Sequence, residues 1–101
     1  MKASAVLLLC AAAVLAQGAD AAAGGKIFAE KCAICHSIAD HETKIGPPLK
    51  DTSKGKLPSG RNATREVLLK QINDGGAGMP VFRELLTSEE KENVIAYVMT
   101  L

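Results

Sequence analysis

Apolar residues recur at helical spacing in three segments of this chain, and no segment shows the strict alternation of a half-buried strand. In the first segment, residues 22–31, the side chains of Gly24, Ile27 and Phe28 fall on one helical face. The pattern predicts a helix that buries this face, and Gly24 would let another backbone approach it closely. The predicted fold class is therefore all-α.

The second helical segment runs from a cap at Asn62 or Thr64 to about Asn73, and Asp74-Gly75 ends it. The residues that it would bury are Val67, Leu68 and Ile72.

The last segment begins with a capping box, in which Thr87 is the cap and Glu90 holds the third helical position. The helix that starts here has one apolar stripe, made of Val94, Tyr97, Val98 and Leu101. This stripe suits packing across the first helix. Met99, inside the same helix, is predicted to be ordinary core.

The segments between the helices contain residues typical of turns. Residues 37–48 predict a loop, because Asp40-His41-Glu42 is polar and Gly46-Pro47-Pro48 forbids a helix. Residues 51–60 are rich in Lys, Ser, Gly and Pro, and they predict an exposed loop without regular structure.

The front end has the form of a secretory signal peptide. A lysine at position 2 is followed by an apolar run over residues 3–16 and by several small-x-small cleavage sites over residues 17–23. We predict a signal peptide over residues 1–21 and a single domain over residues 22–101. Cleavage is expected after Ala19, Ala21 or Ala23. The apolar run is short for a membrane span.

Charge and size narrow the function classes further. The formal net charge of +1 gives no reason to expect a nucleic-acid partner. Residues 43–65 hold six basic residues against one acid, whereas residues 84–92 hold four acids against one lysine. With two Phe, one Tyr and no Trp, so small a domain buries little apolar area and needs a cofactor or cross-link to stabilise it.

A stabilising cofactor is indicated by Cys32-Ala33-Ile34-Cys35-His36, the C-x-x-C-H pattern of covalent haem attachment. On one helical turn the two thiols would face the same way, so each can form a thioether to one porphyrin edge. His36 follows at once and can place a ring nitrogen on the iron. The motif predicts one haem c, and a poorly folded chain without it.

Other sites that use two cysteines fit less well. A redox dithiol expects a βαβ setting, and an iron–sulfur cluster needs four thiolates where this chain has three cysteines. Zinc held by Cys32, Cys35, His36 and His41 would require two adjacent residues to reach one small ion.

Pro47 is a candidate partner of the histidine. A ligating imidazole normally donates its other N–H to an acceptor, and a proline carbonyl eleven residues after His36 could accept it. Leu49 would then lie against the porphyrin. A plain Gly-Pro-Pro turn is the alternative that the sequence leaves open.

Met79 is the candidate second axial ligand. It follows three glycines that allow a tight backbone beside a flat ligand, and Pro80 holds its backbone. Phe82 would shield it. A lone Met is usually gap filler, yet this setting favours a thioether that reaches the iron from the face opposite His36.

Together these residues resemble the class I monohaem cytochromes c, most closely the short bacterial and algal-type members. The motifs that carry the resemblance are Gly24 and Phe28, Cys32 to His36, Gly46-Pro47-Pro48-Leu49, Met79-Pro80-Val81-Phe82 and Val94-Ile95-Ala96-Tyr97. The resemblance implies a small helical bundle around haem, with the first and last helices crossing. It also implies thioethers at Cys32 and Cys35, axial ligands His36 and Met79, and the Pro47 carbonyl on the imidazole. The Trp that bonds a propionate in the longer members of the family is missing here.

We interpret the chain as a periplasmic one-electron carrier between redox proteins. With both axial positions filled by protein, the iron has no open site for a substrate, which argues against an enzyme. Two alternatives stay open at this point. One is a tightly bound cytochrome subunit of a periplasmic dehydrogenase, and the other is a haem sensor or peroxidase-like enzyme in which Met79 leaves the iron.

Overall fold

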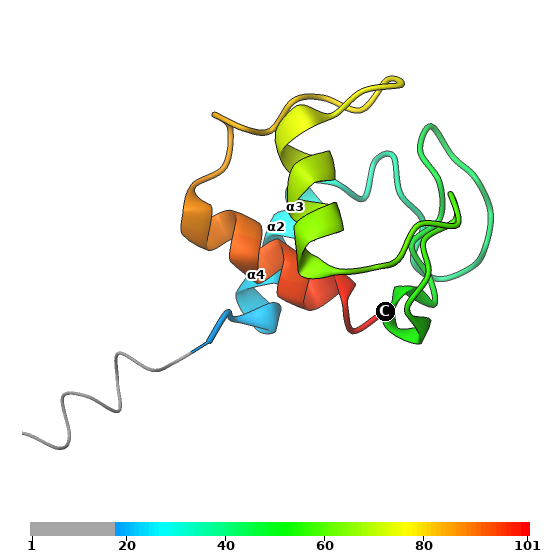
Figure 1. Cartoon of the computed structure of the whole chain (residues 1–101), viewed down its shortest axis with the longest axis horizontal. Helices are drawn as coiled ribbons and strands as arrows, with labels where there is room; N and C mark the ends of the chain where they lie inside the picture. Colours follow the sequence, from blue (N-terminus) through cyan, green and yellow to red (C-terminus); the bar gives the residue numbers. More distant parts are fainter. Residues whose placement is uncertain (1–17) are drawn as a thin grey trace, which may run out of the picture.

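Three helices and one short 3-10 helix make up the fold in a computed structural model that describes residues 18–101 (Figure 1). The elements are α2 (Ala21–Lys31), η1 (Thr52–Lys54), α3 (Arg65–Asp74) and α4 (Ser88–Val98). Over residues 18–101 only two isolated bridges occur and no strand, so the all-α prediction is confirmed. Most of the predicted signal peptide lies outside the described residues. Within them, no helix has the length and apolarity needed to span a membrane.

Each helix begins at a side-chain cap. The Thr64 hydroxyl accepts from the Val67 amide at 3.2 Å, so of the two predicted caps of α3 it is Thr64 that acts. The predicted capping box of α4 is confirmed, with Thr87 and Glu90 exchanging bonds of 2.9 and 3.1 Å. The caps supply partners for amides that have none inside the helix.

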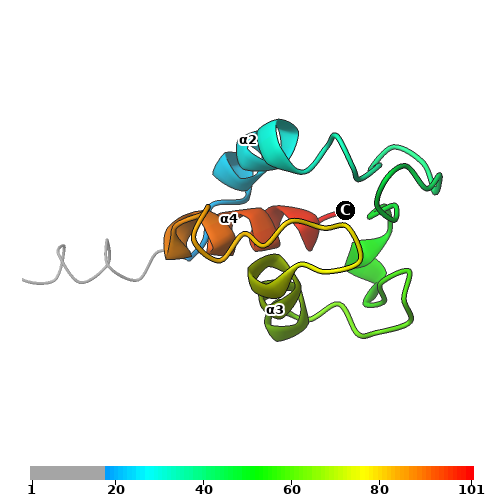
Figure 2. The same ribbon diagram turned by 90° about the horizontal axis from the view of Figure 1, so that it is seen from above.

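Helix α4 lies between α2 and α3 (Figure 2). It crosses α2 at Gly24, where a Cβ would stand 1.9 Å from the Asn93 carbonyl oxygen. One turn further, the rings of Phe28 and Tyr97 pack with centroids 5.5 Å apart. Phe28 is 2% exposed and Val94 is 2% exposed, so this crossing is the most deeply buried part of the core.

The loop over residues 51–60 is more ordered than its composition predicts, so that prediction is wrong in part. It contains η1, whose first residue, Thr52, is 1% exposed and donates to the Leu49 carbonyl at 2.6 Å. Leu57 also joins the core. The Ser53 amide donates to the carbonyl of Leu101 at 2.7 Å, so the segment is held against the C-terminus, beside which it lies in Figure 1.

Met99 is not core, contrary to the prediction. Helix α4 ends at Val98, and Met99 is the C-cap residue with 37% of its surface exposed. Val98 and Leu101 of the predicted stripe pack in or against the core, whereas Met99 lies outside that stripe.

Candidate functional site

A cavity of about 350 Å³, here called the central cavity, is enclosed by all three helices and the loops around them. This volume is within the range of about 300–1,000 Å³ that is usual for ligand pockets. Every predicted site residue lines it: Cys32, Cys35, His36, Pro47, Leu49, Met79 and Phe82. The buried side chains of its wall are apolar: Phe28, Leu57, Leu68, Phe82, Leu86, Val94, Ile95 and Val98.

The two thiols lie on a turn that directly follows α2, rather than inside a helix. The Cys32 and Ala33 amides both donate to the Phe28 carbonyl at 2.9 Å, which ends the helix. The amides of Cys35 and His36 then both donate to the Cys32 carbonyl, at 3.1 and 3.0 Å. Both cysteines are free and half-buried. Burial, with Cys35 close by, raises the pKa of the Cys32 thiol.

The imidazole of His36 is held from below by the loop. Its Nδ1 lies 2.7 Å from the carbonyl oxygen of Pro47, so the predicted hydrogen bond is present. That bond puts the proton on Nδ1 and leaves Nε2 as the nitrogen free to bind a metal. Gly46 makes the approach possible, since a Cβ there would stand 2.8 Å from His36 Cε1.

Met79 is presented by a tight turn. The amides and carbonyls of Gly76 and Met79 exchange two bonds of 3.0 Å around Ala77 and Gly78, which have φ values of 52° and 94°. Only glycine fits at Gly75, where φ is 61° and a Cβ would stand 2.5 Å from the Met79 carbonyl oxygen. The glycines that the sequence showed before Met79 therefore have a structural reason.

Gln71 is a site residue that the sequence interpretation missed. Its side-chain amide nitrogen lies 3.5 Å from the Met79 sulfur and 3.0 Å from the Gly75 carbonyl. Arg61 donates to the other end of the same amide at 3.0 Å. A polar residue on a helix with no motif around it carries no signal for this role, because the contact exists only after the Met79 turn folds back onto α3.

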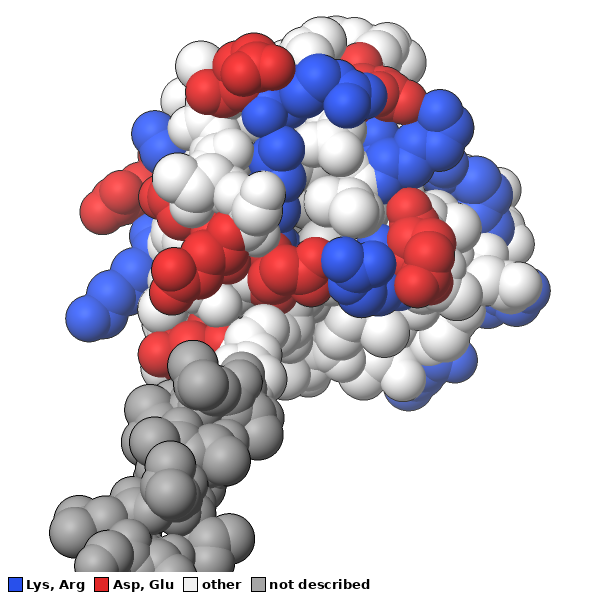
Figure 3. All heavy atoms as spheres, turned by 60° about the vertical axis from the view of Figure 1, so that its left-hand side comes forward, with Lys and Arg blue, Asp and Glu red and all other residues white. Residues whose placement is uncertain are grey.

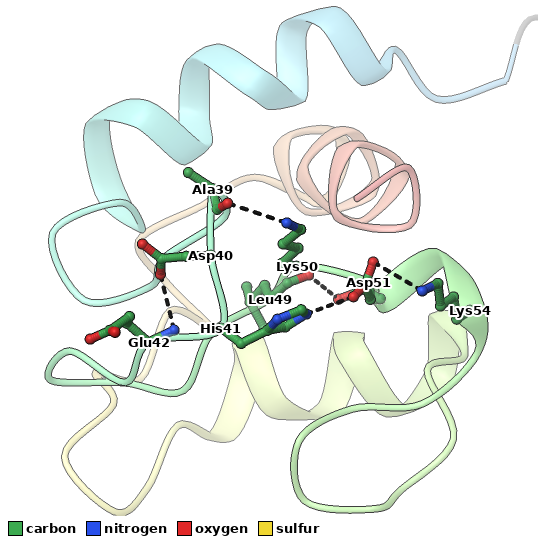
Figure 4. Close-up of polar contacts among 9 residues, drawn as sticks. Ala39, Asp40, His41, Glu42, Leu49, Lys50, Asp51 and Lys54 are labelled. Carbon is green, nitrogen blue, oxygen red and sulfur yellow. Dashed lines mark hydrogen bonds and ion pairs between the residues drawn. The ribbon is translucent and has the colours of Figure 1, made fainter.

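Side-chain bonds brace the loop that carries Pro47 (Figure 4). His41 Nε2 lies 2.6 Å from an Asp51 carboxylate oxygen, and Lys54 lies 3.6 Å from the other oxygen. Lys50 reaches back to the Ala39 carbonyl at 3.4 Å. The hydrogen bond from His41, with Lys54 also near, lowers the pKa of Asp51. The loop is irregular but is tied at several points.

The mouth of the central cavity is apolar and cationic. Ile34 and Ile45 line the cavity, yet each is 75% exposed, so they stand at its opening. Among the described residues, its charged lining consists of Lys31 and Arg61, with no carboxylate. The Lys44 ammonium donates to the Ala33 carbonyl at 3.0 Å, which adds a third cation beside the cysteine turn.

Elsewhere the two signs of charge are mixed. Figure 3 shows a face on which acidic and basic side chains alternate. Arg65, from the basic segment, pairs with Glu92 from the acidic one, and Asp74 pairs with Lys70 and Arg83. The charge contrast between the two segments is therefore reduced where the fold brings them together.

The residues that line the cavity fit a covalently held haem. A c-type haem uses two thiols for covalent attachment, and an imidazole and a thioether as donors to its iron; all four groups converge here on one apolar cavity. No cluster of three or more His, Cys, Asp or Glu that could hold a bare metal ion occurs among residues 18–101.

Comparison with known proteins gives one consistent group. Residues 19–98 match the family described as cytochrome C oxidase, cbb3-type, subunit III. A cytochrome c6 of Rippkaea orientalis is 40% identical over 79% of this chain and 69% of its own length. A cytochrome c6 of Leptolyngbya boryana is 35% identical over 80% and 92%. The crystal structure of cytochrome c6 from the diatom Phaeodactylum tricornutum superimposes with a TM-score of 0.64, at 34% identity over 80% of this chain and 92% of that one.

Proposed function

Since this chain belongs to the cytochrome c family and is an electron carrier with one covalently bound haem c, we propose which of its residues hold that haem. Cys32 and Cys35 would form the thioethers, and His36 Nε2 and Met79 Sδ would bind the haem iron. Pro47 would hold the His36 ring, Leu49 would lie against the porphyrin and Phe82 would shield Met79. The observation that carries the proposal is the convergence of all seven on one cavity.

When bound, the haem supplies an iron that alternates between the ferric and ferrous states. The residues around the haem limit its reaction to this exchange of one electron. The His36 N–H held by Pro47 keeps the ring in one tautomer and makes its Nε2 a stronger donor. The buried apolar wall, which includes Phe82 and Leu68, excludes water and disfavours extra charge.

A ligand-substitution experiment tests the assignment. In the Met79→Ala holoprotein we expect the ferric sulfur-to-iron charge-transfer band to vanish, because Met79 is the one methionine among the described residues that line the cavity. Met99→Ala is the matched control, because Met99 is exposed at the end of α4. An unaltered visible spectrum in Met79→Ala would refute the assignment.

The carrier acts between redox proteins, and we propose that they dock at the mouth of the central cavity. Ile34 and Ile45 are the exposed apolar contacts, and Lys31 and Lys44 provide positive charge beside them. This arrangement fits a partner whose own surface is acidic around a small apolar patch.

Salt dependence tests the docking face. In Lys44→Gln we expect slower electron exchange with an acidic redox protein and a weaker dependence of the rate on ionic strength. Lys70→Gln, on α3 and paired with Asp74, is the control that leaves both quantities unchanged. Equal effects of the two substitutions would contradict this docking face.

We place the carrier in the periplasm, on the strength of the signal-peptide pattern of its first residues. The alternative of a dehydrogenase subunit is not favoured, because relatives along most of the chain are cytochromes c6. A cell fractionation in which the haem protein stayed in the cytoplasm would overturn the placement.

A further inference from the structure

The start of α2 is anchored by a residue just before the predicted mature domain. Asp20 is the N-cap: its carboxylate accepts from the Ala23 amide at 3.1 Å and its carbonyl accepts from the Gly24 amide at 3.0 Å. Its own amide donates to the side-chain oxygen of Asn93, on α4, at 2.8 Å. Asp20 therefore belongs to the folded domain.

Removal of Asp20 would damage the crossing of α2 and α4. Asn93 is only 8% exposed and packs where Gly24 meets α4, so little water can replace the lost donor. A chain that started at Ala22 would also place its α-ammonium group in the first turn of α2. Positive charge there is unfavourable, because the amides of a helix N-terminus are themselves partly positive.

Signal peptidases cut after a small-x-small tripeptide, and residues 16–23 offer three. They are Ala16-Gln17-Gly18, Ala19-Asp20-Ala21 and Ala21-Ala22-Ala23. A cut after Ala19 would need a small residue at position 17, where Gln17 stands. Of the three tripeptides, only the first leaves Asp20 on the mature chain.

We propose that a signal peptidase hydrolyses the bond between Gly18 and Ala19, so that the mature protein begins at Ala19. Water adds a hydroxyl to the Gly18 carbonyl carbon and a hydrogen to the Ala19 nitrogen. The site is one residue before the range expected from the sequence pattern. This cleavage concerns the maturation of the chain rather than electron transfer. Its support comes from the N-cap of α2 and from the sequence of the leader.

The intact mass of the holoprotein, secreted from the full-length chain with its own leader, tests the proposal. We expect the mass of haem plus residues 19–101, and Ala19 as the first residue in N-terminal sequencing. A start at Asp20, Ala22 or Gly24, or an uncut leader, would overturn it.

Two substitutions at the cleavage positions sharpen the test. Gly18→Leu puts a large residue at the last leader position, and we expect either uncut protein or a shift to Ala22. Ala21→Gln is the matched control, since it puts a large residue into the second and third tripeptides, spares the first and leaves Ala19 as the first residue. Unchanged processing of Gly18→Leu, or a changed start in Ala21→Gln, would contradict the assigned bond.

A stability comparison tests why the site lies there. We expect the folding constant of the holoprotein to fall about tenfold in Asp20→Ala, whereas Asp20→Asn, which keeps a capping oxygen, changes it much less. Equal denaturation midpoints for wild type and Asp20→Ala would show that the cap does not select the start.

Discussion

The two sides of the central cavity hold their ligands in different ways. On the histidine side, His36 makes a 2.7 Å bond to the Pro47 carbonyl, and the loop that carries Pro47 is tied down by side chains. On the methionine side, the sulfur of Met79 has one weak contact, 3.5 Å from Gln71, and sits on an exposed turn of glycines. The imidazole is therefore positioned by hydrogen bonds, whereas the position of the sulfur depends mainly on backbone shape.

Removal of the haem should have the largest effect on stability, because the histidine side and the methionine side of the cavity then both lose the group that they hold. In the double variant Cys32→Ala/Cys35→Ala, which cannot be linked to haem, we expect no cooperative thermal transition by circular dichroism. The apolar wall would surround an empty space of about 350 Å³, and so small a domain has little other core. A native-like melt of the haem-free chain would show that the helices alone carry the fold.

Alanine at the two close-approach glycines should separate the sides. We expect Gly46→Ala to displace His36 and Gly75→Ala to displace Met79, each at a cost of about 1–3 kcal/mol in denaturant unfolding of the holoprotein. The added Cβ would meet a ring atom at 2.8 Å in the first case and a backbone oxygen at 2.5 Å in the second.

The spectra of these variants should differ as well. Gly75→Ala is expected to weaken the sulfur-to-iron band, whereas Gly46→Ala should leave it and alter the imidazole signals in nuclear magnetic resonance. Gly55→Ala is the control, because a Cβ there meets nothing within 4 Å although its φ of 96° still carries strain. The same spectral change in both variants would erase the distinction between the sides.

Replacement of Gln71 should have a smaller effect, confined to the methionine side. An N–H that points at the sulfur withdraws electron density and so disfavours ferric iron. We expect Gln71→Leu to lower the reduction potential by roughly 40 mV, the equivalent of a hydrogen bond of about 1 kcal/mol. Asn62→Leu, an exposed polar-to-apolar change outside the cavity wall, should not move it. A potential unaffected by Gln71→Leu would mean that the contact is incidental.

The brace at Asp51 should have the smallest effect, confined to the histidine side. Because His41 lowers the pKa of Asp51 in the folded protein, the contribution to stability is present above the unfolded pKa of about 3.9 and is lost as the pH falls below it. We expect the denaturation midpoints of wild type and Asp51→Asn to differ near pH 6 and to converge at lower pH. A difference that grew on acidification would contradict the sign.

Much of the candidate site could be predicted because its signals are local. The C-x-x-C-H spacing and the glycines before Met79 each lie within a few residues of the ligand they serve, and the Gly-Pro-Pro turn begins ten residues after His36. Hydrogen bonds that close over three or four residues also place the caps, so Thr87 was predicted for α4 and Thr64 was one of two candidates for α3.

The local sequence was enough to predict the three helices, the threonine cap of α4 and the residues that meet in the cavity, since periodicity and spacing act between near neighbours. Only the tertiary structure decided that Gln71 meets the Met79 sulfur, that Thr52 is buried and that Asp20 is tied to Asn93. These contacts join residues whose meeting depends on how the helices and loops pack. A polar side chain carries the same local signal whether it ends in water or against a distant partner.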